Sequence, residues 1–137
     1  MTDERVAATL VWKPQPFGIE AEWTVGRRPE RVPESPSIES EFLHGGDVQS
    51  MYRVEQWHGG WYPFVRWQYC EGGRKFALNA PHSIVNAWDV GLEWQPWPKF
   101  EVSISCTRTL EGTHTLSAPY EASEDADRLG FQAQFNF

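Results

Sequence analysis

Hydrophobic and polar side chains alternate one for one over several stretches of this chain. The clearest stretch ends the chain, where odd positions carry Leu129, Phe131, Ala133, Phe135 and Phe137 and even positions carry Gly130, Gln132, Gln134 and Asn136. A period of two is typical of a β-strand with one apolar and one polar face. Because no apolar stripe with helical spacing is present, we predict an all-β protein with about seven strands, at 6–12, 17–25, 43–55, 61–70, 86–94, 100–109 and 127–137.

The links between these expected strands alternate in length. Short links rich in Pro or Gly fall at 13–16, 56–60 and 95–99, and long polar links fall at about 26–42, 71–85 and 111–126. An up-and-down membrane barrel has this rhythm, with short periplasmic turns and long outer loops. A soluble Greek-key sandwich does not. The rhythm therefore predicts an antiparallel up-and-down meander.

Aromatic residues are unusually frequent, at 15% of the chain, although the mean hydropathy is −0.55. Many of the rings flank the short links, so Trp12 and Phe17 frame one Pro-rich turn and Trp94 and Phe100 frame another. In a membrane barrel such rings form belts at the two interfaces. We therefore expect membrane-belt positions for Trp12, Trp23, Trp67, Trp88, Trp94 and Trp97. The alternative is that the rings cap a soluble core.

The net charge of −7 argues against a nucleic-acid partner, which would require a basic face. No segment has the ~20 apolar residues that a membrane helix needs. The first residues begin acidic and contain no apolar core before Pro14, so we expect no signal peptide in this chain. Cys70 and Cys106 have no metal-type spacing; they either pair in an oxidising compartment or serve as small strand residues.

No residue constellation indicates catalysis or a cofactor. The four histidines are single and lack metal spacing, so no metal site is expected. Glu20 and Glu22 share one strand face and could be paired acid/base groups, but a solvated face explains them better, because nothing in the sequence desolvates them. We predict that the chain is not an enzyme and binds no cofactor.

Several segments resemble the late strands of the phosphate-selective porin (O and P type) family. They are 46–54, 61–69, Val90–Trp97 and the ending Phe131–Phe137, and the resemblance spans about Leu10 to Phe137. The ending resembles the C-terminal signal by which outer-membrane barrels are recognised for insertion, with Phe131, Phe135 and Phe137 as its aromatic residues. The resemblance implies an outer-membrane β-barrel of 16 strands, most often a homotrimer, that passes small anions such as phosphate.

The resemblance further implies contacts with outer-membrane lipid and with the barrel assembly machinery. The polar strand positions would then line the pore, and we expect Arg53, Arg66, Gln68, Glu93, Glu101, Gln132 and Gln134 among them. The predicted polar face is acidic rather than basic, because Glu20, Glu22, Asp47, Asp89, Glu93 and Glu101 outnumber Arg53 and Arg66. No residue is therefore assigned to phosphate binding.

Seven strands that end at a periplasmic Phe137 place Met1 on the outer side, whereas a complete barrel has both ends in the periplasm. We therefore expect this chain to be the C-terminal fragment of a 16-stranded transmembrane barrel, insoluble when made alone because of its open edges and bare apolar face. The alternative is a soluble small β-barrel that binds an apolar ligand, as lipocalins do.

Overall fold

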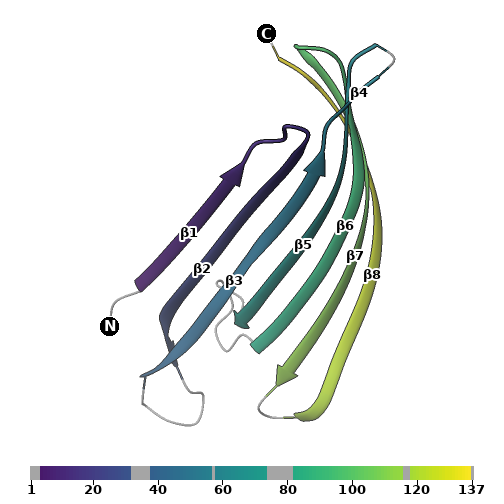
Figure 1. Ribbon diagram of the computed structural model, residues 1–137. Helices are drawn as coiled ribbons and strands as arrows, with labels where there is room; N and C mark the ends of the chain where they lie inside the picture. The colour runs from purple at the N-terminus through teal and green to yellow at the C-terminus, as the bar shows by residue number, and fades with distance from the viewer. Residues whose placement is uncertain (1–3, 32–37, 57, 74–81, 116–117, 137) are drawn as a thin grey trace.

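The computed structural model describes residues 4–31, 38–56, 58–73, 82–115 and 118–136. These residues form one antiparallel sheet, which confirms the predicted all-β meander (Figure 1). The strands are β1 (Glu4–Trp12), β2 (Phe17–Arg31), β3 (Ile38–Tyr52), β4 (Val54–Glu55), β5 (Gly60–Gly73), β6 (His82–Trp97), β7 (Phe100–Thr115) and β8 (Ala118–Phe135).

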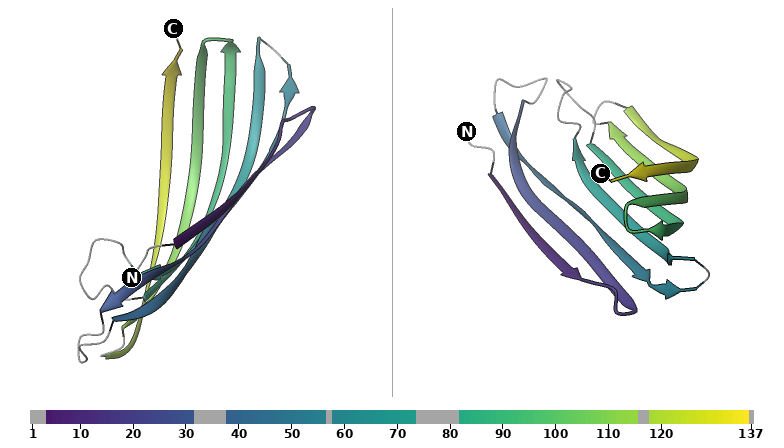
Figure 2. Two further views of the ribbon diagram at one scale, coloured as in Figure 1. Left: turned by 90° about the vertical axis from the view of Figure 1, so that its left-hand side faces the viewer. Right: turned by 90° about the horizontal axis from the view of Figure 1, so that it is seen from above.

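Every long strand pairs with its neighbour in the chain, in the order β1-β2-β3-β5-β6-β7-β8, and β4 pairs with β5. The structure has eight strands where the sequence indicated about seven, because the ladder is interrupted at Arg53 and the short β4 resumes it. The sheet is not closed: β1 and β8 lie apart at its two edges (Figure 2).

The strands run further than the alternation indicated. The expected long links at 26–42, 71–85 and 111–126 were wrong in extent, because β2, β3, β5, β6, β7 and β8 all continue into them. Backbone ladders hold these extensions between β2 and β3, β5 and β6, and β7 and β8, and backbone hydrogen bonds need no alternation of apolar and polar residues. Proline does not end these extensions either, since Pro29 pairs with Ser40 within the β2–β3 ladder.

The two ends of the sheet differ. At the turn end, short connections such as 13–16 and 98–99 join the strands, and at the loop end the strands are joined through 32–37, 74–81 and 116–117. His58 and Gly59 have positive φ values of 62° and 127°, as a tight reversal requires. The C-terminus lies at the turn end and the N-terminus near the loop end (Figure 1).

The strand ends are stepped across the sheet. One row of register partners starts at Trp12, the last residue of β1, and ends at Leu129 of β8. Strand β8 continues past this row to Phe135, which is about 20 Å further at ~3.3 Å per residue. Such a stagger is what tilted strands in a barrel wall produce.

Candidate functional site

The cross-strand register sorts the side chains into an apolar face and a polar face that run across the whole sheet. One apolar row joins Leu92, Ile104 and Phe131 on β6, β7 and β8. A row of opposite parity joins Gln49, Arg66, Asp89, Thr107 and Arg128. A shift of one residue between two neighbouring strands would move apolar side chains to the polar face. Each face is continuous across the sheet because every pair of strands keeps the matching register.

Burial along β6 is the reverse of that in a soluble protein. Ala87 and Asp89 of the polar face are 5% and 3% exposed, whereas Trp88 and Val90 of the apolar face are 50% and 57% exposed. Among the residues whose burial the structure describes, Ala87 is the one buried hydrophobic side chain. The apolar side chains therefore enclose no core in the described part of the chain, and the soluble apolar-ligand barrel is not retained.

Six of the seven residues expected to line a pore share the polar face. Cross-strand pairing places Glu93, Glu101, Gln132 and Gln134 on neighbouring strands toward the turn end, and Arg66 and Gln68 nearer the middle of the sheet. Arg53 is different, because it lies between β3 and β4 at the turn end. There its guanidinium pairs with Glu55, and its backbone nitrogen donates to the Pro16 carbonyl oxygen at 2.6 Å.

Arg66 and Asp89 form an ion pair across β5 and β6. Nε and Nη2 of Arg66 both donate to Asp89 Oδ2, at 2.9 and 2.7 Å. The Asp89 side chain is buried and that of Arg66 is about one-third exposed. Asp89 Oδ1 is buried and has no hydrogen-bond partner among the described atoms. This pair was not expected from the sequence, because it depends on the register between two strands.

Toward the turn end the polar face is hollowed beside Glu93. The hollow has a volume of about 180 Å³ and is lined by Gln49, Met51, Tyr62, Phe64, Glu93 and Gln95. Gln95 Nε2 donates to Glu93 Oε1 at 2.6 Å, which holds the carboxylate in place. The one ionised group in this lining is therefore an anion.

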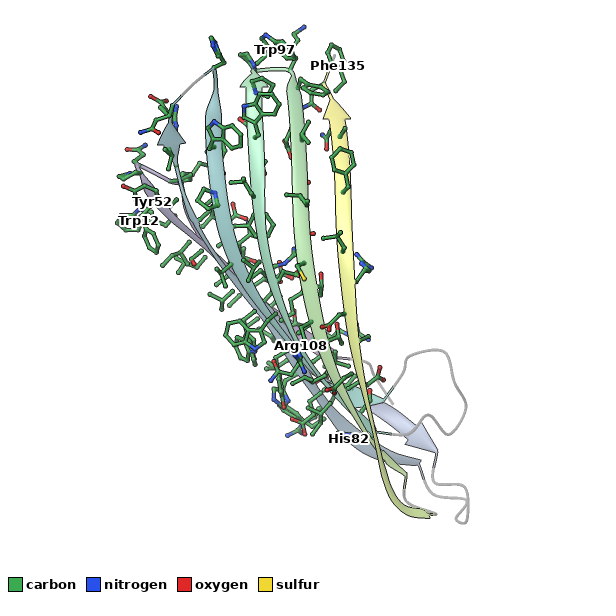
Figure 3. All side chains as sticks on the ribbon, turned by 90° about the vertical axis from the view of Figure 1, so that its right-hand side faces the viewer. Trp12, Tyr52, His82, Trp97, Arg108 and Phe135 are labelled. Atoms are coloured by element: carbon green, nitrogen blue, oxygen red, sulfur yellow. The ribbon has the colours of Figure 1, made fainter. Side chains whose placement is uncertain are left out.

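The apolar face carries a group of rings at the turn end. Trp97 lies 5.7 Å from Phe100 between ring centroids, and Phe100 lies 6.5 Å from Phe135. Trp61 and Trp94 stack at 5.4 Å. Figure 3 places Trp97 and Phe135 together at this end, and Trp12 beside Tyr52 at the stepped end of β1 to β3.

A second group of rings lies closer to the loop end of the apolar face. Trp23 stacks on Trp67 at 6.2 Å and on Tyr69 at 6.1 Å, and Trp67 lies 6.3 Å from Trp88. Trp67 Nε1 donates to Asn86 Oδ1 at 2.8 Å, so its polar atom is satisfied next to exposed rings. The expected belt tryptophans thus divide between two levels of the sheet, with Trp12, Trp94 and Trp97 at the turn end and Trp23, Trp67 and Trp88 here.

Polar side chains border this second ring group on its loop side. Tyr69 Oη donates to Glu71 Oε2 at 2.6 Å, and His44 and His82 approach Glu71 at 3.4 and 3.3 Å. Sequence reasoning missed this cluster, because its members come from three strands and the histidines are single in the sequence. On β7 and β8 of the same face, Arg108 pairs with Asp125 at 3.6 Å.

The two ring groups are separated by somewhat less than the height of an apolar membrane band. From Trp61 to Tyr69, the rings of β5 that are furthest apart, the chain advances about 26 Å at ~3.3 Å per residue, or about 20 Å along the normal for a strand tilt of ~40°. An outer-membrane barrel has an apolar band about 25 Å tall between its two aromatic girdles.

The remaining expected residues are placed as follows. Phe131 and Phe135 lie exposed on the apolar side of edge strand β8, and Phe137 lies outside the described residues. Both cysteines are free and exposed: Cys70 is on the polar face, whereas Cys106 pairs with Val90 and Leu129 on the apolar face. They lie on opposite faces and on strands separated by β6, so a disulfide between them is sterically excluded.

The described residues contain no group of three His, Cys, Asp or Glu side chains placed to hold a metal ion. Nor does that part of the chain contain a helix long and apolar enough to cross a membrane.

Comparison with known proteins gives one family. The family model described as phosphate-selective porin O and P matches residues 1–137, the whole chain. No curated protein and no solved structure gives a significant match.

Proposed function

This chain belongs to the phosphate-selective porin O and P family, and from that premise we propose that its polar face forms part of the wall of a water-filled channel. The family is one of outer-membrane channels, which implies the outer membrane for the parent protein. Small hydrophilic solutes, including the small anions that the family description points to, would diffuse passively along this wall. No enzymatic step is part of the proposal.

The inverted burial along β6 carries this proposal. A face of exposed Trp and Val side chains is costly in water and favourable against lipid, at ~25 cal/mol per Å² of apolar surface. The opposite face holds Arg66, Asp89 and Glu93 within polar contacts, as a surface toward water requires. Bands of rings at two levels, about 20 Å apart along the normal, support the same orientation.

Assembly follows from the same orientation. We propose that the barrel assembly machinery reads the exposed aromatic residues of β8, namely Phe131 and Phe135 with the terminal Phe137. Outer-membrane lipid is the partner of the apolar face, and a homotrimer is the assembly that we expect for the parent protein. The parent would have 16 strands, of which this chain supplies a part.

The two cysteines test the orientation without any engineered label. Both are exposed on the sheet itself. Cys70 lies on the polar face in the row of Glu111, and Cys106 lies on the apolar face about 16 Å nearer the turn end, at ~3.3 Å per residue. In the chain refolded into phosphocholine vesicles, a water-soluble maleimide should label Cys70 faster than Cys106. We expect a difference of roughly tenfold or more, because a water-soluble reagent does not reach a thiol that is covered by hydrocarbon.

The matched variants Cys70→Ser and Cys106→Ser report the two thiols separately. After unfolding in urea, both variants should react at similar rates, which shows that protection comes from lipid. Equal labelling of both thiols in intact vesicles would contradict the proposed channel wall. A monodisperse monomer in buffer without detergent would contradict it independently.

A further inference from the structure

The polar face carries more negative than positive charge. Among the residues whose side chains the structure describes, it holds eight carboxylates and three guanidinium groups, since register places Glu20, Glu22, Asp47, Glu55, Asp89, Glu93, Glu101, Glu111, Arg5, Arg66 and Arg128 on it. Arg108 and Asp125, by contrast, lie on the apolar face. The excess of negative charge therefore lies on the polar face, which is the face proposed to meet water.

The guanidinium group of Arg66, at the centre of the sheet, forms an ion pair with Asp89. Two of its donors point at one carboxylate oxygen, at 2.9 and 2.7 Å. An anion that recruited Arg66 would leave the Asp89 carboxylate buried without its counter-ion, which is strongly unfavourable. Asp89 Oδ1 has no further hydrogen-bond partner among the described residues, so the Arg66 guanidinium is the group that balances this carboxylate. Arg66 is therefore a structural partner of Asp89 rather than a ligand for a passing phosphate.

Two carboxylates dominate the polar face nearer the turn end. Glu93 projects into the hollow described above, and Ser103 on β7 lies opposite it in the register. Glu101 is two residues along β7 from Ser103, on the same face. The other residues that line the hollow are neutral. A solute at this level meets carboxylates from two adjacent strands.

Resting on the proposed channel function, we infer that this wall favours cations over anions. Carboxylates that line a water-filled pore concentrate cations and repel anions. Each unit charge within about 10 Å of the ion path changes the local ion concentration roughly twofold at low salt. The small anions that the family description implies would then pass by diffusion, without attraction from this surface.

The reversal potential of the complete parent protein, reconstituted in a KCl gradient, tests the inference. The potassium-to-chloride permeability ratio should exceed one by several-fold at 0.1 M salt and should be about twofold lower in Glu93→Gln. At higher salt the ratio should fall toward one, because salt screens the carboxylates of the wall. Pores that conduct but prefer chloride would overturn the inference and leave the channel proposal standing. Absence of any conductance would overturn both.

Charge-matched variants separate the wall from the rest of the molecule. Asp89→Asn releases the Arg66 guanidinium and should lower the permeability ratio about twofold. Asp125→Asn makes the same change of charge on the apolar face and should leave the ratio unchanged. If Asp125→Asn lowered the ratio as much as Asp89→Asn, overall charge rather than this wall would set selectivity, and the inference would fail.

Thiol labelling with charged reagents tests the same inference without a measurement of conductance. Ser103→Cys, in a background of Cys70→Ser and Cys106→Ser, places a thiol between Glu93 and Glu101. Relative to a small free thiol, this thiol should react several-fold faster with a cationic methanethiosulfonate than with an anionic one. A ratio at or below that of the free thiol would overturn the inference.

Discussion

An arginine placed on either side of β7 should have opposite consequences for the stability of the folded protein in lipid. Ile104 lies on the apolar face between Leu92 and Phe131 and is 48% exposed. It is about 13 Å along the strand from Phe100 in the turn-end ring group, at ~3.3 Å per residue. With a strand tilt of ~40°, that is about 10 Å along the membrane normal, near the middle of the apolar band.

The expected cost of Ile104→Arg follows from this depth. A guanidinium on the lipid face at the midplane costs about 2–4 kcal/mol, which lowers the folding equilibrium constant by about 30- to 900-fold. Ser105→Arg is the matched control, one residue along the same strand. Ser105 faces the polar side between Gly91 and Gly130, where a long side chain has room to reach water. Its cost should stay below about 1 kcal/mol.

The measurement is a urea titration of the chain refolded into phosphocholine vesicles, followed by tryptophan fluorescence. Ile104→Arg should shift the unfolding midpoint to clearly lower urea, and Ser105→Arg should leave it close to that of the parent chain. The reasoning is refuted if the two substitutions cost the same, or if Ser105→Arg costs more. Either result would mean that the apolar face of β7 is not in contact with lipid.

Three further results are expected. Gly46→Ala should destabilise the protein by about 1–3 kcal/mol in the same urea titration, because a Cβ there would overlap a carbonyl oxygen of β2. Gly112→Ala, whose Cβ would have its nearest neighbour at 4.0 Å, should be nearly neutral, and equal effects would contradict the register. Asp89→Ala should cost about 1–3 kcal/mol, whereas replacing both members of its ion pair by apolar residues should cost less; a larger cost for the double variant would argue against the pair. Phe135→Ser should reduce the fraction of chain that resists urea extraction from outer membranes, and an unchanged fraction would remove this ring from the insertion signal.

The alternation of side chains made the faces predictable, because a period of two assigns each strand residue to a side of the sheet whatever its neighbours are. The strand lengths were less predictable. Residues 26–31, for example, continue β2 although their sequence has no alternation, because the backbone ladder to β3 that holds them does not require it. Proline and serine in this region were therefore poor markers of a loop.

The contacts within each face could not be predicted. Arg66 and Asp89 are 23 residues apart, and their meeting depends on a register that the link 74–81 does not reveal. The cluster around Glu71 has the same origin, since His44 and His82 reach it from two other strands. Arg53 was assigned to the wall on parity alone, and the interruption that sets β4 apart moved it to a turn.

The two rims of the sheet have one further consequence. Seven long strands in strict antiparallel order leave β1 and β8 running in the same direction. Rotation about the membrane normal preserves that direction. If several copies of this chain alone formed a barrel by such rotations, β8 of each copy would therefore pair in parallel with β1 of the next. Closing the wall with antiparallel seams alone requires an odd number of additional strands between β8 and β1, since backbone groups at a rim cannot remain unpaired in hydrocarbon.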